Sequence, residues 1–386
     1  MKTYWQDLKK EFTGYNSGKL MKDLMAGLTV AAVALPLALA FGVSSGATAA
    51  AGLITAIVSG FVISLLGGAF YQISGPTGAM AAILISIIAQ YGMSGVFTAT
   101  LMAGILLVLA GILHLGRLTA FIPMPVIAGF TSGISVIIAL GQLDNLFGVA
   151  STGSSAVAKF ASYFTGGFSP DWISLAIGGL VILFIAFYPK KWNAVVPASL
   201  VAIILSTAAV MLLHLQVGSV GEIPSSLMLE ERFSFAGFKL SSIKGLLAPA
   251  VSIAALGMVE SLLCGASAGR MTGVHLNNNR ELIAQGVGNI LSPLLGGIPA
   301  TAAIARTSVA IKSGAQTRLT GMFHSVFLLI SMLALGPIMS QIPLSALAGV
   351  LLVTAWRMNE WDTIKYIFQG KFKGAILKFL ATMAAT

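Results

Sequence analysis

Charged side chains are scarce in this chain. They make up 9% of its 386 residues, whereas hydrophobic residues make up 57%. A soluble domain has about 25% charged residues, so this composition excludes a typical soluble protein. An apolar stretch of about 20 residues can cross a bilayer as a helix. The mean hydropathy of +0.93 therefore indicates an integral membrane protein in contact with the lipid bilayer.

Several functional signals are also missing. The single cysteine, Cys264, excludes an internal disulfide. The four histidines have no metal-ligand spacing, and the chain has no Walker A or paired-cysteine motif. We therefore expect no enzyme, no metal site and no cofactor. The net charge of +10 is typical of basic cytoplasmic loops, so nucleic acid is not an expected partner.

The apolar stretches predict an all-α membrane protein with thirteen segments. They cover residues 23–41, 51–67, 76–91, 95–115, 121–141, 171–188, 194–214, 246–265, 282–295, 300–313, 319–336, 342–356 and 374–386. The third and tenth segments are short for a span, which predicts half-helices. The thirteenth segment is too short to cross completely, so we expect that the native protein continues.

The distribution of Lys and Arg predicts the orientation. With the N-terminus inside, sixteen of the 22 basic residues lie in cytoplasmic loops, and only Lys159, Arg232, Lys239 and Lys244 lie outside. Basic loops mark the cytoplasmic side. We therefore expect a multi-pass protein of the cell (inner) membrane, with a cytoplasmic segment of residues 1–22 before a membrane domain of residues 23–386.

Two loop regions carry weaker patterns. Residues 1–20 are predicted to form an amphipathic helix on the inner surface, with apolar side chains on one face. These side chains are Tyr4, Trp5, Leu8 and Phe12. The external stretch 215–245 alternates apolar and polar residues in places, which predicts short strands over the outer face.

One feature occurs twice. Leu65–Gly68 leads into Pro76–Met80, and Leu294–Gly297 leads into Pro299–Ala303. Paired, interrupted hydrophobic segments in two halves of a membrane protein indicate a transporter binding site. Proline fits the first turn of a helix, where the unpaired N–H groups and the helix dipole attract anions. Two such helix starts facing each other predict an anion site, although two ordinary breaks between helices give the same pattern.

Polar residues near these starts are candidates for the chemistry. Glu260 lies in the middle of an apolar segment, where a carboxylate costs about 2.5–3.5 kcal/mol, so it is a candidate coupling residue that takes up and releases a proton. Arg306 is a candidate anion ligand that also pairs with Glu260. The alternatives are a helix-capping carboxylate and an arginine that reaches the inner surface. Ser74, Thr77 and Thr301 are expected to bring hydroxyls to the helix starts.

These residues lie in motifs that resemble the SulP family of anion transporters. The matching stretches are ALPLALAFG (34–42), ISGPTGAM (73–80), VESLLCG (259–265), NRELIAQGVGNI (279–290), LLGGIPATAAIARTSVAIKSGAQT (294–317) and RMNEW (357–361). The resemblance implies an inverted seven-plus-seven helix repeat with a core domain and a gate domain. It places residues 23–141 and 246–336 mostly in the core and adjoining helices, and 171–214 and 342–386 mostly in the gate.

The resemblance also implies site residues. Thr77 and Ala303 align with anion contacts of bicarbonate-transporting members, and Phe41, Gly78 and Ala302 belong to the same motifs. The eighth segment carries the coupling carboxylate, which is Glu260 here.

Two departures from the family pattern concern coupling. Cys264 and Ile304 replace threonines that belong to a sodium site in bicarbonate-transporting members. A hard cation prefers oxygen ligands, so these replacements favour proton coupling over sodium. Members carry fourteen spans and a cytoplasmic STAS domain, whereas this chain has an incomplete thirteenth span and no STAS domain.

The leading functional hypothesis is secondary active transport of a small inorganic oxyanion, of the bicarbonate or sulfate type. It predicts proton coupling, an elevator-like movement of core against gate, and a homodimer. The alternatives are a C4-dicarboxylate transporter of the same family, a nucleobase transporter of related fold and a passive anion channel. The absence of an acid from the tenth segment disfavours the nucleobase transporter.

The charge bias gives a direct test of topology. A single cysteine placed at Ser17, in a chain whose Cys264 has been replaced, is expected to react with a membrane-impermeant thiol reagent only after the cells are opened. Labelling from outside intact cells would refute a cytoplasmic N-terminus.

Overall fold

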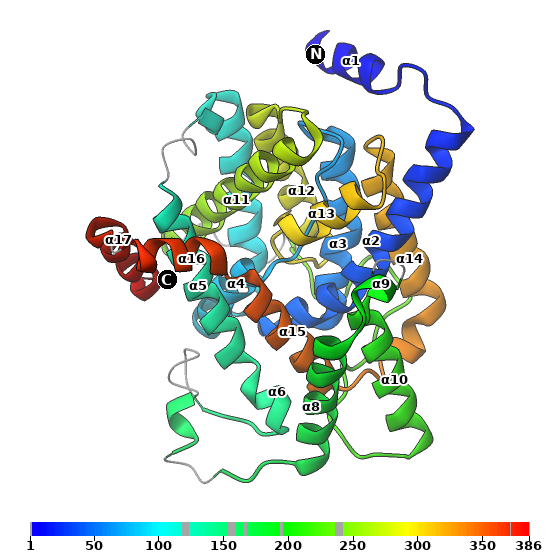
Figure 1. Cartoon of the computed structure of the whole chain (residues 1–386), viewed down its shortest axis with the longest axis vertical. Coiled ribbons are helices and arrows are strands. Elements are labelled where there is room, and N and C mark those ends of the chain that lie inside the picture. Colours follow the sequence, from blue (N-terminus) through cyan, green and yellow to red (C-terminus); the bar gives the residue numbers. More distant parts are fainter. Residues whose placement is uncertain are drawn as a thin grey trace.

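The computed structural model describes residues 2–117, 123–152, 160–164, 168–193, 196–235, 242–370 and 372–385. Helices dominate these residues, and six of them are long and apolar enough to cross a membrane (Figure 1). The predicted all-α membrane fold is therefore confirmed. Lys159, Lys239, Lys371 and parts of the segments that begin at 121 and 194 and end at 386 lie outside the described residues.

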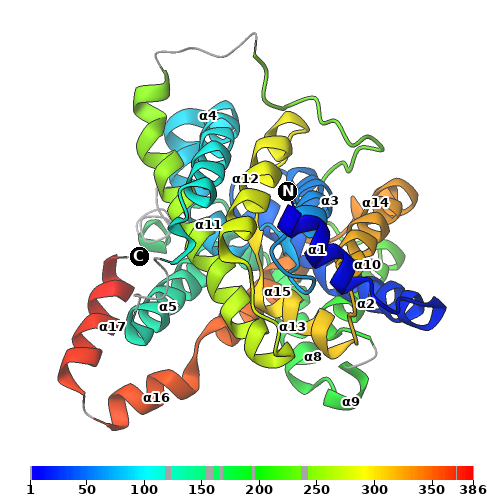
Figure 2. The same cartoon turned by 90° about the horizontal axis from the view of Figure 1, so that it is seen from above.

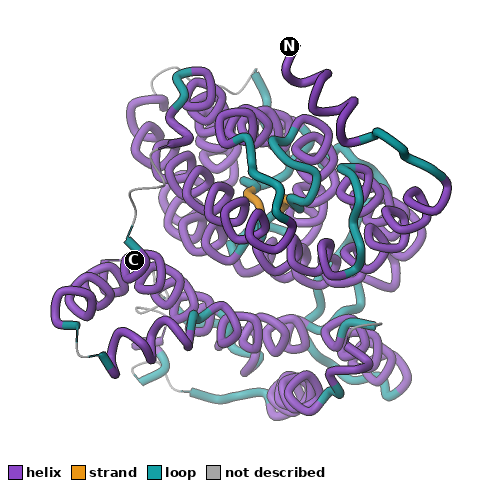
Figure 3. Tube along the Cα trace, turned by 45° about the horizontal axis from the view of Figure 1, so that its top comes forward, coloured by secondary structure: helices purple, strands orange, loops and turns teal. Residues whose placement is uncertain are grey.

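The helices pack in two groups. The first contains α2 (Ser17–Ser44), α3 (Ala49–Leu66), α4 (Gly78–Ile112), α11 (Ser242–Thr272), α12 (Asn278–Leu294), α13 (Ile304–Lys312) and α14 (Leu319–Met339). The second contains α5 (Met124–Gly141), α6 (Leu143–Phe147), α8 (Trp172–Phe187), α10 (Ala198–Leu212), α15 (Leu344–Met358), α16 (Trp361–Gln369) and α17 (Lys373–Ala385). Figure 3 shows the groups as two layers, with the strands inside the first.

The edges of the second group are also defined. The short helix α9 (Lys190–Asn193) lies between α8 and α10. Helices α16 and α17 lie beside α5 at the edge of the molecule (Figure 2). Thus α5 packs with the C-terminal helices, although it lies in the first half of the chain.

The third segment is interrupted by a glycine. Gly92 lies inside α4 with φ of 66° and ψ of −173°, which is not helical. A positive φ suits glycine, which has no Cβ to clash. The helix therefore has a short first part, from Gly78 to Tyr91, before a second part that ends at Ile112. The tenth segment is also short, because α13 has nine residues.

The prediction of short strands in the outer loop is wrong for the described residues 215–235. Only an isolated bridge, Ser219 to Pro343, forms there. The amide of Val220 donates to the Ile342 carbonyl at 2.9 Å, and that of Leu344 donates to the Gly218 carbonyl at 2.9 Å. The loop thus pairs with the turn before α15 and not with itself, so the alternation reflects an extended segment over other elements.

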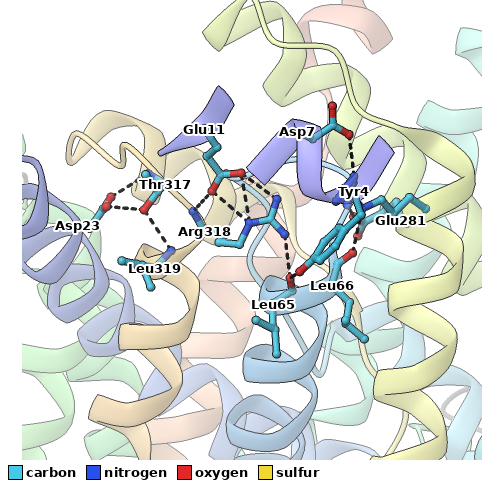
Figure 4. Close-up of polar contacts among 12 residues, drawn as sticks. Tyr4, Asp7, Glu11, Asp23, Leu65, Leu66, Glu281, Thr317, Arg318 and Leu319 are labelled. Atoms are coloured by element: carbon cyan, nitrogen blue, oxygen red, sulfur yellow. Dashed lines mark hydrogen bonds and ion pairs between the residues drawn. The ribbon is translucent and has the colours of Figure 1, made fainter. Parts of the chain in front are cut away.

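A helix at the N-terminus, α1 (Lys2–Glu11), docks on the first group (Figure 4). Glu11 binds the guanidinium of Arg318 through both carboxylate oxygens, with a shortest distance of 2.8 Å. The Tyr4 hydroxyl and Arg318 both donate to the carbonyl of Leu65, at 2.9 and 2.7 Å. Carbonyls at a helix C-terminus need such partners, so these contacts complete the end of α3.

A second carboxylate, Asp23 of α2, caps the start of α14. It accepts hydrogen bonds from the amides of Gln316 and Thr317 and from the hydroxyls of Thr317 and Thr320. The Tyr15 hydroxyl also donates to it, at 2.9 Å. Burial and then the bond and charge of Asp23 raise the pKa of Tyr15 to about 12, so this phenol remains a donor at neutral pH.

The two ion pairs of α1 should differ in their effect on stability. Glu11 and Arg318 have side-chain exposures of 11% and 4%. Glu11→Gln leaves a nearly buried guanidinium without its carboxylate, so we expect a loss of about 3 kcal/mol in the free energy of unfolding. Asp7, which pairs with Arg280, is 53% exposed, and Asp7→Asn should cost below about 1 kcal/mol. Thermal unfolding of both variants in detergent measures the difference, and equal losses would contradict it.

Candidate functional site

The two interrupted segments meet through their backbones. Strand β1 (Ser74–Gly75) pairs antiparallel with strand β2 (Thr301–Ala302), with Ser74 opposite Ala302 and Gly75 opposite Thr301. The amide of Ala303 adds a bond to the Ile73 carbonyl at 2.9 Å. Residues more than 220 positions apart in the sequence are thus brought to one place, and α4 and α13 both begin from it.

The helices begin later than the prolines predicted. Thr77 is the N-cap of α4, and its hydroxyl accepts from the amide of Met80. Ala303 is the N-cap of α13 and has no capping side chain. Pro76 and Pro299 therefore precede the helices instead of occupying the first turn. The reason is the strand pair, which keeps the residues directly before each helix extended.

Both helix starts present backbone amides. Among the described residues, the amides of Gly78 and Ala79 in α4 and of Ile304, Ala305 and Arg306 in α13 have no hydrogen-bond acceptor. Each helix start also carries roughly half a positive charge from the helix dipole. These groups are suited to binding an anion.

Glu260 lies against the start of α4. The Thr77 hydroxyl donates to Glu260 Oε2 at 2.9 Å, so it links the carboxylate to the helix cap. Glu260 is half-buried, while Thr77 is 8% exposed. A change in the protonation of Glu260 therefore acts directly on the residue that caps α4.

Arg306 does not form the expected ion pair with Glu260. The ion pairs of the described residues do not include these two side chains. Arg306 is 1% exposed, and its Nη2 donates to the Pro76 carbonyl at 2.8 Å. Its Nη1 has no hydrogen-bond partner and lies 2.6 Å from the position that a Cβ on Gly75 would take. The guanidinium therefore lies beside Gly75 and Pro76 at the end of β1. The Pro76 carbonyl is free to accept this hydrogen bond because the strand pair does not use it.

The predicted hydroxyls are divided between different partners. Only Thr77 lies at a helix start. Ser74 accepts from Gln285 Nε2 at 2.9 Å, and the Thr301 hydroxyl lies 2.9 Å from that of Ser261. Ser74 and Thr301 thus hold the strands against α12 and α11. In the register Ser74 lies opposite Ala302 and Thr301 lies opposite Gly75, so their side chains lie on opposite faces of the strand pair.

The other predicted residues surround the two starts. Gly78 is the first residue of α4, Phe41 is 5% exposed and its ring lies beside Gly78, and Ala302 is buried in β2. Ile304 is 47% exposed at the first position of α13. Cys264 donates to the Thr307 hydroxyl at 3.3 Å and is therefore engaged with α13 instead of Glu260.

Sequence reasoning missed the side chains that support the strand pair. Gln285 and Asn289 lie one turn apart on α12, where Asn289 binds both the amide and the carbonyl of Ala300, at 2.8 and 2.9 Å. Thr55 of α3 similarly binds both backbone groups of Ile298. Glu281 accepts from the amide of Gly68 and from Gln285. The detectable signal was a polar residue at every fourth position of an apolar helix, namely Glu281, Gln285 and Asn289.

Apolar helices long enough to cross a membrane surround two helices that begin at one strand pair, so the fold is that of a membrane protein. The chain belongs to the sulfate permease family, because residues 20–381 match the model described as Sulfate permease family. It is therefore a member of a family of anion transporters.

Individual relatives agree with this assignment. The chain is 40% identical to "Putative sulfate transporter YvdB" of Bacillus subtilis, over 97% of this chain and 71% of that protein. It is 34% identical to the bicarbonate transporter BicA of Picosynechococcus, over 92% of this chain and 65% of that protein. The chain thus spans about two thirds of the length of these relatives.

A solved structure shares the fold. It is the transmembrane domain of a cyanobacterium bicarbonate transporter BicA, with a TM-score of 0.88, 30% identity and coverage of 96% of both chains. The similarity extends over nearly the whole of this chain, so it includes both helix groups.

The contact between Gly75 and Arg306 can be tested. Gly75 has a φ of +156°, and an added Cβ would lie 2.6 Å from Arg306 Nη1. Gly75→Ala should therefore lower the free energy of unfolding by more than about 1 kcal/mol. Gly179→Ala in α8 is the control, because a Cβ there would meet no atom within 4 Å, and it should be neutral or slightly stabilising. Thermal unfolding distinguishes the two, and an unchanged Gly75→Ala variant would contradict the contact.

Proposed function

We propose that this protein is a secondary active transporter of a small inorganic oxyanion, of the bicarbonate or sulfate type. The observation that carries the proposal is the meeting of the α4 and α13 starts, with five backbone amides that have no acceptor among the described residues. Backbone amides at helix starts suit the oxygen atoms of an anion. The bicarbonate and sulfate names of the relatives support the same class.

The contacts of this anion follow from the two helix starts. Gly78 and the Thr77 cap bind from α4, Ala303 and the amides after it bind from α13, and Ala302 supplies the close backbone approach. Arg306 is hydrogen-bonded to the Pro76 carbonyl, and its positive charge attracts the anion without direct contact. We therefore assign Arg306 an indirect role, which replaces the direct ligand expected from sequence.

The position of Glu260 supports proton coupling as part of this proposal. Two unit charges about 4 Å apart interact by about 4 kcal/mol at an effective dielectric constant of 20. An ionised Glu260 beside Thr77 repels an incoming anion, and a protonated Glu260 does not. Binding of the proton thus favours binding of the anion, and the reciprocal effect is required by linkage. The protein would carry both together.

The two helix groups suggest how the site changes sides. Both half-helices and Glu260 belong to the first group, whereas α5 and α15 of the second group flank it. We propose that the first group is the core and that it slides against the second group, the gate, in an elevator-like movement. A site held by one rigid strand pair can move as a unit.

Substrate and coupling are tested in proteoliposomes. Uptake of labelled bicarbonate, sulfate and a C4-dicarboxylate is measured with and without an inward proton gradient. We expect the gradient to drive uptake of at least one small oxyanion, with little effect of sodium. Uptake that requires sodium and ignores the pH gradient would refute proton coupling.

Glu260→Gln tests the coupling residue. This variant keeps the shape of the side chain but fixes it as neutral, so uptake driven by the proton gradient should vanish while exchange of anion for anion persists. Glu230→Gln, at an exposed position of the outer loop, is the control and should match the parent. Retention of gradient-driven uptake by Glu260→Gln would place the coupling elsewhere.

A further inference from the structure

The start of α4 is covered by a side chain from the other helix group. A Cβ on Gly78 would collide with Cδ1 of Ile138, and it would lie 3.3 Å from Cε1 of Phe41. Ile138 is 4% exposed and Phe41 is 5% exposed, so both side chains are packed against this position. Gly78, the first residue of α4, is therefore covered by the apolar side chains of Ile138 and Phe41.

The start of α13 is covered differently. Ile304, its first residue, is 47% exposed, and Ala305 is also exposed. The two helix starts meet at one strand pair, yet one is closed by apolar side chains and the other is accessible. The size of a ligand that bridges the two helix starts is therefore limited on the side of α4, whereas the side of α13 leaves room for a larger ligand.

The two covering residues belong to different groups. Phe41 is part of α2, which packs mostly with α14 and α3 of the first group, although it also contacts α15 and α10. Ile138 is part of α5, which packs with α15 and α17. A movement of one group against the other therefore removes Ile138 from Gly78, while Phe41 stays with the half-helix.

We propose that Ile138 is a specificity-determining residue, whose side chain limits the size of the anion that fits against the start of α4. The proposal rests on the proposed transport function. In this proposal a small oxyanion binds between the helix starts without displacing Ile138, whereas a C4-dicarboxylate needs the space that the Ile138 side chain occupies. An apolar cover also keeps water away from the amides, which strengthens their interaction with the anion.

The alternative is that Ile138 only fills space between the two groups. In that case its truncation lowers stability but leaves the ratio between substrates unchanged. Selectivity, measured on folded protein, thus separates the two roles.

The experiment compares three variants in proteoliposomes. Ile138→Ala opens the space above Gly78, Ile138→Val removes only one methyl group, and Ile137→Ala makes the same change at the neighbouring position of α5. Initial uptake of labelled succinate is divided by that of labelled sulfate or bicarbonate, whichever the parent transports, for protein that elutes as a single folded species. One methylene group more or less in a hydrophobic pocket changes the discrimination between two substrates by about 10–200-fold.

We expect Ile138→Ala to raise the dicarboxylate-to-oxyanion ratio about tenfold or more. Ile138→Val should raise it less, and Ile137→Ala should leave it unchanged. If Ile138→Ala does not fold, the direction of change in Ile138→Val decides. An unchanged ratio in the folded Ile138 variants, or an equal rise in Ile137→Ala, would overturn the role of Ile138 while leaving oxyanion transport intact. A parent protein that transports no small oxyanion would refute the proposed function itself, and this role with it.

Discussion

The pairing of Ser74–Gly75 with Thr301–Ala302 is the contact on which the rest of the site depends. Within a bilayer, backbone groups that are not in a helix must find partners inside the protein, because no water is available to them. The strand pair meets this requirement for two unwound segments at once. It also fixes where α4 and α13 can begin, so it sets the distance and direction of the two positive helix ends.

Polar side chains around the strand pair make this pairing possible. Asn289, Thr55 and Gln285 satisfy groups of the extended segments that the ladder does not reach. Ser261 binds the same region from α11, and Glu260 is its neighbour in sequence. The carboxylate is therefore held in place by the contacts that hold the strands, which explains how it remains beside Thr77 although no other charged residue lies between Lys244 and Arg270 of this helix.

The ion pairs among the described residues lie apart from Arg306. Glu11, Asp7 and their arginines lie around the end of α3, where Tyr4 also binds (Figure 4). Arg306 is separated from them and lies beneath Pro76 with one unpaired nitrogen. A buried cation without an ion pair is costly, and an anion bound above it would reduce that cost.

The amino-acid sequence by itself determined the membrane class, the segments and the half-helices, because hydrophobic length and interruptions by Gly and Pro act locally along the chain. It also singled out Thr77, Gly78 and Glu260, since hydroxyl, glycine and carboxylate are rare signals among apolar residues. Only the tertiary structure decided the partners of Arg306, the supporting roles of Gln285 and Asn289, and the contact of Ile138 with Gly78. Those depend on which helices cross, and residues up to about 240 positions apart, such as Thr55 and Ile298, meet there through packing that no local pattern encodes.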